Sequence, residues 1–305
     1  MKRILFAIVA LSLGVNVFAQ EMKTYKFAEK DGQELFMDVY TPENVTDSTV
    51  TVMFVFGGGF MSGERNNSSS TDYCNALVER GHIAVAIDYR LGLKGVKKLN
   101  LLHHEPLENA IYMATEDAIS ALQYLIDNAT ELKINTERIV LVGSSAGAIT
   151  VLETDYAICN GLLNSDILPK DFHLAGVASY AGAIYSTNGK VKYRNHKPAP
   201  TMLFHGTADK LVTYKQLRLF GVGFFGSSKI VPVFKNNDYP YYFRRYKGFG
   251  HSVANMFTSS IDDFERFVDH YVVNHEQLQV EEDYHNMDDT EKPSYDNFTP
   301  NDLYK

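Results

Sequence analysis

The chain has 305 residues, which is enough for one large α/β domain with a full core or for two small domains. Its composition is that of an ordinary globular protein, with 45% hydrophobic and 22% charged residues. The formal net charge of −8 argues against a nucleic acid as partner, because nucleic-acid binding needs a basic surface.

The first nineteen residues have the pattern of a signal peptide. Lys2 and Arg3 form a positive start, residues 4–15 are apolar, and Val17 and Ala19 place small or apolar side chains at −3 and −1 of a cleavage site. We expect cleavage after Ala19 and an exported protein, periplasmic or secreted. The apolar run is too short to span a membrane comfortably, so an uncleaved anchor is the disfavoured alternative and no stable membrane insertion is expected after cleavage.

Strand-like and helix-like segments alternate along the rest of the chain. Residues 34–40 alternate between apolar and polar side chains and end at Thr41–Pro42, which predicts an edge strand with one solvated face. Residues 50–56 are more continuously apolar, as in a strand covered on both faces. Further strands are expected at 82–88, 138–142, 174–179, 201–204 and 241–246, and helices at 70–80, 107–127, 146–159 and 261–271. This alternation predicts a doubly wound, mostly parallel sheet with helices on both faces.

Three segments fall outside this alternation. Residues 91–106 and 186–199 fit no regular element, and they lie where a wall or lid over a site could be built. Residues 276–305 contain nine acidic residues and two lysines, a balance of −7, with few aliphatic side chains. We therefore expect one α/β domain over residues 20–275, followed by a flexible acidic tail over 276–305.

The two cysteines, Cys74 and Cys159, both fall in expected helices. Export would permit a disulfide between them, and two buried free thiols are the alternative. Two cysteines so far apart do not indicate a metal site.

The pentapeptide Gly143-Ser144-Ser145-Ala146-Gly147 stands between an expected buried strand and an expected helix. This is the pattern G-x-S-x-G of a nucleophile elbow, in which a serine occupies a strained turn and its neighbours must be small. The helix that follows begins with free backbone N–H groups, which can stabilise a developing oxyanion. Ser145 is thus the candidate nucleophile, although so short a pattern also occurs by chance in loops.

A glycine-rich loop follows the buried strand 50–56. Its three glycines, Gly57, Gly58 and Gly59, allow the backbone to approach a ligand closely and to turn its N–H groups inward. We expect an oxyanion hole formed by the N–H groups of Gly58, Gly59 and Ala146. The alternative is a tight turn that merely requires positive φ.

Two further candidates follow later strands. Asp209 lies just past the strand 201–204 and is expected to orient an imidazole, with capping of the next segment as its alternative role. His251 lies in a glycine-flanked loop between the last expected strand and the last expected helix. The order Ser145, Asp209, His251 is that of the α/β-hydrolases. We expect His205 to be a structural neighbour and not a member of this set.

Six blocks in this order resemble those of α/β-hydrolase carboxylesterases, in particular the exported bacterial esterases of the hormone-sensitive-lipase-like and carbohydrate-esterase branches. The blocks are D-V-Y-x-P at 38–42, a G-G-G loop, D-Y-R-L at 88–91, G-x-S-A-G, H-G-x-x-D and G-x-G-H. One position departs from the pattern: the family usually has His at the start of the glycine loop, and this chain has Phe56. Packing is then expected to hold the loop in place of a polar tether.

The resemblance implies hydrolysis of a carboxylic ester through an acyl-enzyme, without a cofactor or a metal. It also suggests short acyl groups, acetyl or feruloyl, on a small molecule or a glycan. Phe60 and Met61, just beyond the oxyanion glycines, are expected to wall the acyl or alcohol pocket, with ordinary core packing as the alternative. Two other readings remain open: a serine peptidase of the same fold, and a catalytically silent hydrolase fold used for binding.

Overall fold

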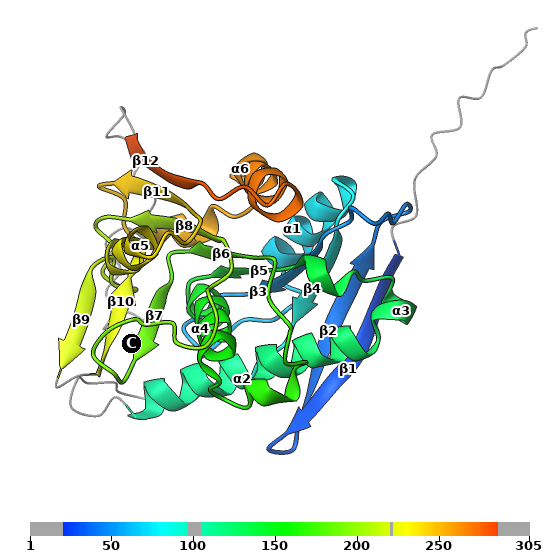
Figure 1. Ribbon diagram of the computed structural model, residues 1–305. Coiled ribbons are helices and arrows are strands. Elements are labelled where there is room, and N and C mark those ends of the chain that lie inside the picture. The colour runs from blue at the N-terminus through cyan, green and yellow to red at the C-terminus, as the bar shows by residue number, and fades with distance from the viewer. Residues whose placement is uncertain (1–20, 97–104, 220–221, 286–305) are drawn as a thin grey trace, which may run out of the picture.

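The computed structural model describes residues 21–96, 105–219 and 222–285, and it contains two β-sheets (Figure 1). The strands are β1 (Glu21–Lys30), β2 (Gln33–Thr41), β3 (Thr51–Val55), β4 (Ile83–Ile87), β5 (Ile139–Ser144), β6 (Gly176–Tyr180), β7 (Ala183–Ser186), β8 (Thr201–Gly206), β9 (Gln216–Leu219), β10 (Val222–Gly226), β11 (Tyr241–Lys247) and β12 (Gln279–His285). Nine of them form the main sheet, in the order β1-β2-β4-β3-β5-β6-β8-β11-β12.

The main sheet is parallel from β4 to β12, and antiparallel only where β2 pairs with β1 and with β4. This confirms the expected doubly wound, mostly parallel sheet. Because the carboxyl ends of parallel strands meet at one edge, the loops after β3, β5, β8 and β11 all leave the sheet on the same side. Those loops carry every candidate site residue.

Helices cover both faces of the sheet. They are α1 (Ser68–Glu79), α2 (Glu105–Asp127), α3 (Ala129–Leu132), α4 (Ala146–Asn160), α5 (Ser227–Asn236) and α6 (Ile261–Phe267), with the π-helical turn η4 (Val268–Val273) and the 3₁₀ turns η1 (Thr136–Arg138), η2 (Ser165–Ile167) and η3 (His251–Asn255). Figure 1 shows α1 and α6 on one face and α2 and α4 on the other. Among the described residues, none of the helices is both long and apolar enough to cross a membrane.

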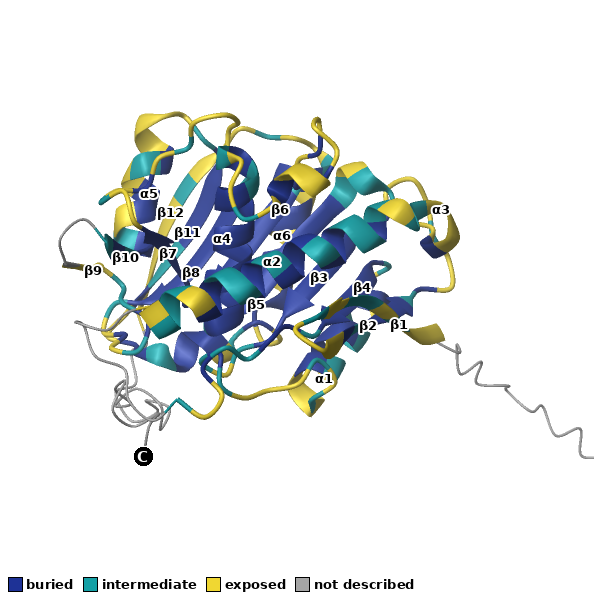
Figure 2. Cartoon of the chain, turned by 90° about the horizontal axis from the view of Figure 1, so that it is seen from below, coloured by how far each residue is buried: buried dark blue, intermediate teal, exposed yellow. Residues whose placement is uncertain are grey.

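The core lies between these layers, and Figure 2 shows the central strands as buried throughout. Every residue of β3, β4, β5 and β6 is buried, as expected for strands covered on both faces. Helix α2 buries the apolar stripe expected of it, from Ala110 to Leu125, and its other side is mostly half-buried. Helix α4 is buried on almost all sides, which explains its run of small and apolar residues.

The expectation that residues 34–40 form an edge strand is wrong. They form β2, which lies between β1 and β4, and the edge of the sheet is β1. Strand β1 was not predicted because its side chains are mostly polar. As an edge strand it faces solvent and needs few apolar residues.

The expectation that the acidic tail begins at residue 276 is also wrong, because Gln279–His285 is β12, the other edge strand of the main sheet. Its acidic side chains face the basic ones of β11: Arg244 pairs with Glu282 at 2.8 Å, and Arg245 pairs with Asp283 at 2.6 Å. The pairing of opposite charges on β11 and β12 therefore indicates this strand, which has too few apolar residues to be recognised by its hydrophobic pattern. Residues 286–305 and the expected signal peptide lie outside the described residues.

A second, three-stranded sheet has the order β7-β10-β9 and was not expected from the sequence. Of the segments predicted to be irregular, residues 187–199 and 91–96 are so, whereas Ser186 ends β7 and residues 105–106 begin α2. Residues 97–104 lie outside the described residues. Cys74 in α1 and Cys159 in α4 are both buried free thiols, which was the alternative to a disulfide.

Candidate active site

Ser145 occupies a strained turn between β5 and α4, with φ 53° and ψ −115°. The glycines around it are needed sterically. A Cβ on Gly143 would lie 2.2 Å from the carbonyl oxygen of Gly147, and one on Gly147 would lie 2.0 Å from that of Val55. The spacing G-x-S-x-G thus lets the start of the helix fold back against its own strand and against the end of β3.

The structure brings Ser145, His251 and Asp209 into one hydrogen-bonded line. Ser145 Oγ is 2.7 Å from His251 Nε2, and His251 Nδ1 is 2.8 Å from Asp209 Oδ2. Because a carboxylate can only accept, Nδ1 carries the proton of that bond, and the neutral ring presents an unprotonated Nε2 to the serine hydroxyl. The imidazole is therefore oriented to remove the hydroxyl proton of Ser145.

Asp209 is buried but remains an anion. Burial alone would raise the pKa of Asp209, yet hydrogen bonds from His205 and His251 outweigh it and lower the pKa to about 2. The other carboxylate oxygen, Oδ1, accepts from the backbone N–H groups of Leu211 at 2.9 Å and Val212 at 3.0 Å. Asp209 thus orients an imidazole and caps the next turn, so both roles expected of it coexist.

Close backbone contacts hold the two loops of the acid and the base together. A Cβ on Gly206 would lie 2.2 Å from the carbonyl oxygen of Gly250, which explains the glycine at the end of β8. The Ser144 hydroxyl donates to the carbonyl of Ala254 at 2.7 Å and so ties the elbow to η3. Sequence reasoning missed Ser144, because a small polar residue beside the nucleophile carries no signal of such a distant partner.

The glycine-rich loop lies directly against the elbow. A Cβ on Gly57 would lie 3.2 Å from Ser145 Cβ and 3.0 Å from the carbonyl oxygen of Ser144. Gly58 and Gly59 both have positive φ, 124° and 64°, and Gly58 accepts through its carbonyl from Met61 N at 3.0 Å. The tight turn and the close approach to Ser145 are therefore features of the same loop.

Aromatic packing holds this loop at its start. Phe56 stacks on Tyr89 with ring centroids 4.4 Å apart, and the Tyr89 hydroxyl donates to the carbonyl of Phe56 at 3.1 Å. Phe60, only 2% exposed, packs edge-on against the same tyrosine, which is the core packing weighed as the alternative to a pocket wall. Met61 is half-buried and remains a candidate for the wall.

Ion pairs hold the loop at its far end. Arg65 lies 2.9 Å from Asp38 of β2 through Nε and 2.8 Å from Asp88, just after β4, through Nη1. The first residues of the blocks D-V-Y-x-P and D-Y-R-L thus converge on one arginine. Asp38 and Asp88 thus position the glycine-rich loop through Arg65. They are not part of the hydrogen-bonded line of Ser145, His251 and Asp209.

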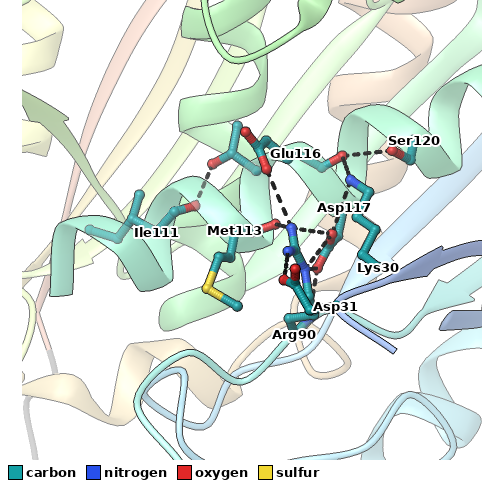
Figure 3. Close-up of polar contacts among 9 residues, drawn as sticks. Lys30, Asp31, Arg90, Ile111, Met113, Glu116, Asp117 and Ser120 are labelled. Atoms are coloured by element: carbon teal, nitrogen blue, oxygen red, sulfur yellow. Dashed lines mark hydrogen bonds and ion pairs between the residues drawn. The ribbon is translucent and has the colours of Figure 1, made fainter. Parts of the chain in front are cut away.

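The arginine of the D-Y-R-L block belongs to a second group, here called the Arg90 cluster: Lys30, Asp31, Arg90, Glu116 and Asp117 (Figure 3). Asp117 of α2 accepts from the backbone N–H of Arg90 at 2.7 Å and from its Nε at 3.0 Å. Lys30, at the end of β1, lies 3.2 Å from the same carboxylate. The cluster joins the β1–β2 hairpin, the loop after β4 and α2.

Within residues 21–96, 105–219 and 222–285, no group of three or more His, Cys, Asp or Glu side chains is arranged to hold a metal ion. His103 and His104 lie outside these ranges.

Comparison with known proteins places the chain in a family. The phospholipase/carboxylesterase family model matches residues 101–268, more than half of the chain, and a second model, BD-FAE, matches residues 37–155. The chain is 31% identical over 121 residues to a cAMP-regulated D2 protein of Dictyostelium discoideum, and 29% identical over 118 residues to a fumonisin B1 esterase of Sphingopyxis macrogoltabida. These matches cover 38% and 37% of this chain and 21% of each relative, so the chain spans about a fifth of the curated relatives' length.

Solved structures agree on the fold. Esterase 2 of Thermogutta terrifontis superimposes with a TM-score of 0.60 at 19% identity, covering 84% of this chain and 96% of that one. The fold is that of the α/β-hydrolase esterases. The chain belongs to the phospholipase/carboxylesterase family.

Proposed function

We propose that the protein is a serine carboxylic-ester hydrolase with Ser145 as nucleophile, His251 as general base and acid, and Asp209 as the residue that orients His251. The observation that carries this proposal is the continuous line of hydrogen bonds from Ser145 Oγ through both nitrogens of His251 to Asp209. It stands on a strained elbow, the backbone conformation that exposes such a nucleophile.

The mechanism follows from this geometry. Ser145 Oγ attacks the acyl carbon while its proton passes to His251 Nε2, and Asp209 stabilises the imidazolium that forms. The carbonyl oxygen becomes an oxyanion, for which the N–H groups of Gly58, Gly59 and Ala146 are the proposed donors. Ala146 is the first residue of α4, where backbone N–H groups have no partner within the helix. His251 then protonates the leaving alcohol. In the second half of the reaction water gives a proton to His251 and attacks the acyl-enzyme, and the carboxylic acid leaves as His251 returns that proton to Ser145 Oγ.

For the substrate we propose a short-chain acyl ester, on a small molecule or a carbohydrate. The support is by analogy: the fumonisin B1 esterase is named for a small-molecule ester, and Thermogutta terrifontis esterase 2 has been solved with propionate and with butyrate bound. We also propose export after cleavage following Ala19. A secreted lipase of Arthroderma benhamiae, 29% identical over 125 residues, is among the relatives.

The test is hydrolysis of p-nitrophenyl acetate, butyrate and octanoate by residues 20–305, with Ser145→Ala measured beside it. We expect acetate or butyrate to react fastest, and Ser145→Ala to lower kcat by roughly six orders of magnitude, as for a triad serine. Ser259→Ala is the matched control and should keep the wild-type rate, because Ser259 is exposed and its hydroxyl donates only to the carbonyl of Met256 among the described contacts, at 3.2 Å. Equal rates for Ser145→Ala and the wild type would reject the proposal and favour a silent binding protein.

The leaving group of the substrate distinguishes the peptidase alternative from the proposed esterase. Acyl p-nitroanilides present an amide in place of the ester. A kcat/KM for a peptidyl p-nitroanilide above that for the matching ester would overturn the esterase assignment while leaving Ser145 as nucleophile.

A further inference from the structure

A second histidine contacts the carboxylate that orients His251. His205, at the end of β8, is fully buried, and its Nε2 lies 3.5 Å from Asp209 Oδ2, the same oxygen that accepts from His251. Its Nδ1 lies 2.9 Å from Ser227 Oγ, at the start of α5. A continuous series of polar groups therefore runs from Ser145 through His251, Asp209 and His205 to Ser227.

The neighbours of His205 determine which nitrogen carries its proton. Nε2 is 3.1 Å from the carbonyl oxygen of Val212, which can only accept, so the proton is on Nε2. Nδ1 of the neutral ring is then an acceptor, and the Ser227 hydroxyl donates to it. Fixed in this way, the Nε2–H group faces both the Val212 carbonyl and Asp209 Oδ2.

We propose that His205, held in this tautomer by the Val212 carbonyl and oriented by Ser227, is a positioning residue for the reaction: it shares the charge of Asp209 Oδ2 with His251 and limits how strongly the acid stabilises the protonated base. This inference rests on the proposed function of the Ser145 site. It assigns His205 a role beyond packing, because a hydrogen-bond donor on Oδ2 reduces the negative charge that His251 experiences.

Within the part of the chain that the structure describes, the ionisable side chains that contact His205 are Asp209 and Tyr214. The Tyr214 ring is 5.5 Å away, and burial raises its pKa, so that it stays neutral. Arg245 lies opposite His205 in the register of β11 and β8, and its guanidinium is paired with Glu281 and Asp283. His251 itself contacts Asp209 and Ser145. A change in the pH profile after substitution of His205 would therefore report on Asp209.

The experiment compares the pH dependence of kcat/KM for p-nitrophenyl acetate in the wild type, His205→Leu and His205→Gln, with thermal unfolding recorded for each. Leucine has a similar volume but donates no hydrogen bond, whereas the glutamine amide can still donate to Asp209. We expect His205→Leu to move the acidic limb to higher pH, because an unshared carboxylate favours protonated His251. We also expect kcat to fall on the order of 10-fold, because Asp209 then loses a contact that holds its carboxylate in position, and this is less than the ~100-fold that a displaced catalytic group can cost.

His205→Gln should restore the wild-type limb, and Ser227→Ala should shift it in the leucine direction by a smaller amount, since it keeps the Val212 contact and only loosens the orientation of the His205 ring. If His205→Leu does not fold, the pH profiles of His205→Gln and Ser227→Ala still test the inference. A limb that stays at the wild-type pH in the leucine and Ser227→Ala variants, or a glutamine variant that behaves like leucine, would overturn the inference. If either of these outcomes is found while Ser145→Ala is inactive, only the inference about His205 is rejected. If Ser145→Ala is active, the proposed function itself is rejected.

Discussion

Two groups of ion pairs fasten the two sides of the main sheet, and they differ in their exposure to water. In the Arg90 cluster, the side chain of Arg90 is 8% exposed and that of Asp117 is 0% exposed. In the pairing of β11 with β12, here called the β12 ladder, Arg245 is 26% exposed and Asp283 is 42% exposed. The first group joins a hairpin to a buried helix, whereas the second attaches an edge strand at the surface.

The difference shows that ion pairs of similar length can contribute very different energies. An exposed pair is worth about 0–1 kcal/mol, because water and salt screen it. Removing one partner of a buried pair leaves an uncompensated charge and costs about 3–5 kcal/mol. The Arg90 cluster should therefore be essential for the arrangement of α2 and the loop after β4, and each contact of the β12 ladder should be dispensable on its own.

Asp117→Ala gives the largest effect expected from this comparison. It leaves the buried Arg90 guanidinium without its main partner and should lower the free energy of unfolding by about 3–5 kcal/mol. Chemical denaturation monitored by circular dichroism measures the loss. The control is Glu116→Gln, which removes a more exposed and longer contact, 3.3 Å from Arg90, and should cost less than 1 kcal/mol. Equal losses for both variants would show that burial does not separate the two carboxylates.

Glu153 sharpens the comparison, because it is a buried carboxyl group whose hydrogen bond comes from a neutral donor, the backbone N–H of Tyr185. Burial raises the pKa of Glu153 to about 8, against which that hydrogen bond acts only in part. Since the pKa is raised on folding, this group favours the folded state fully below its unfolded pKa near 4.5. That contribution is lost as the pH rises toward 8.

Glu153→Gln keeps an acceptor for Tyr185 and removes the titration. Stability between pH 5 and pH 8 should decline less steeply in the variant, by up to about 1.4 kcal/mol per pH unit for one proton. Thermal or urea unfolding across this range measures the slope. Parallel stability curves for the variant and the wild type would mean that Glu153 titrates normally in the folded protein.

Arg245→Ala should have the smallest effect. It removes contacts to Glu281 and Asp283 at the surface, and the free energy of unfolding should fall by about 0.5–1 kcal/mol. The difference from the wild type should shrink further when the salt concentration rises from 0.05 M to 1 M, since the Debye length then falls to about 3 Å. A loss that persists in high salt would point to packing of the arginine stem over Phe243, whose ring lies 5.1 Å from its guanidinium.

Much of the fold could be predicted because its signals are local. The apolar run before Ser145 and the stripe along α2 follow directly from burial on one or both faces, and the structure confirms the strand, the helix and the parallel sheet. The edge strands β1 and β12 could not be found in this way, since they contact the sheet along one side only and contain mostly polar residues. Their signal is a partner elsewhere in the chain, such as Arg244 for Glu282.

The same division holds for the candidate site. The sequence by itself determined the chemical groups and their order, Ser145, Asp209 and His251, because an elbow and strand-end loops impose local spacing that glycine and small residues reveal. Only the tertiary structure decided that Phe60 packs in the core, that Ser144 ties the elbow to η3 and that His205 contacts Asp209. The contacts of Phe60 with Tyr89 and of Ser144 with Ala254 join segments that are far apart in the chain, and the sheet brings these segments together. His205 and Asp209 are only four residues apart, but their contact depends on the path of the loop after β8, which the spacing alone does not specify.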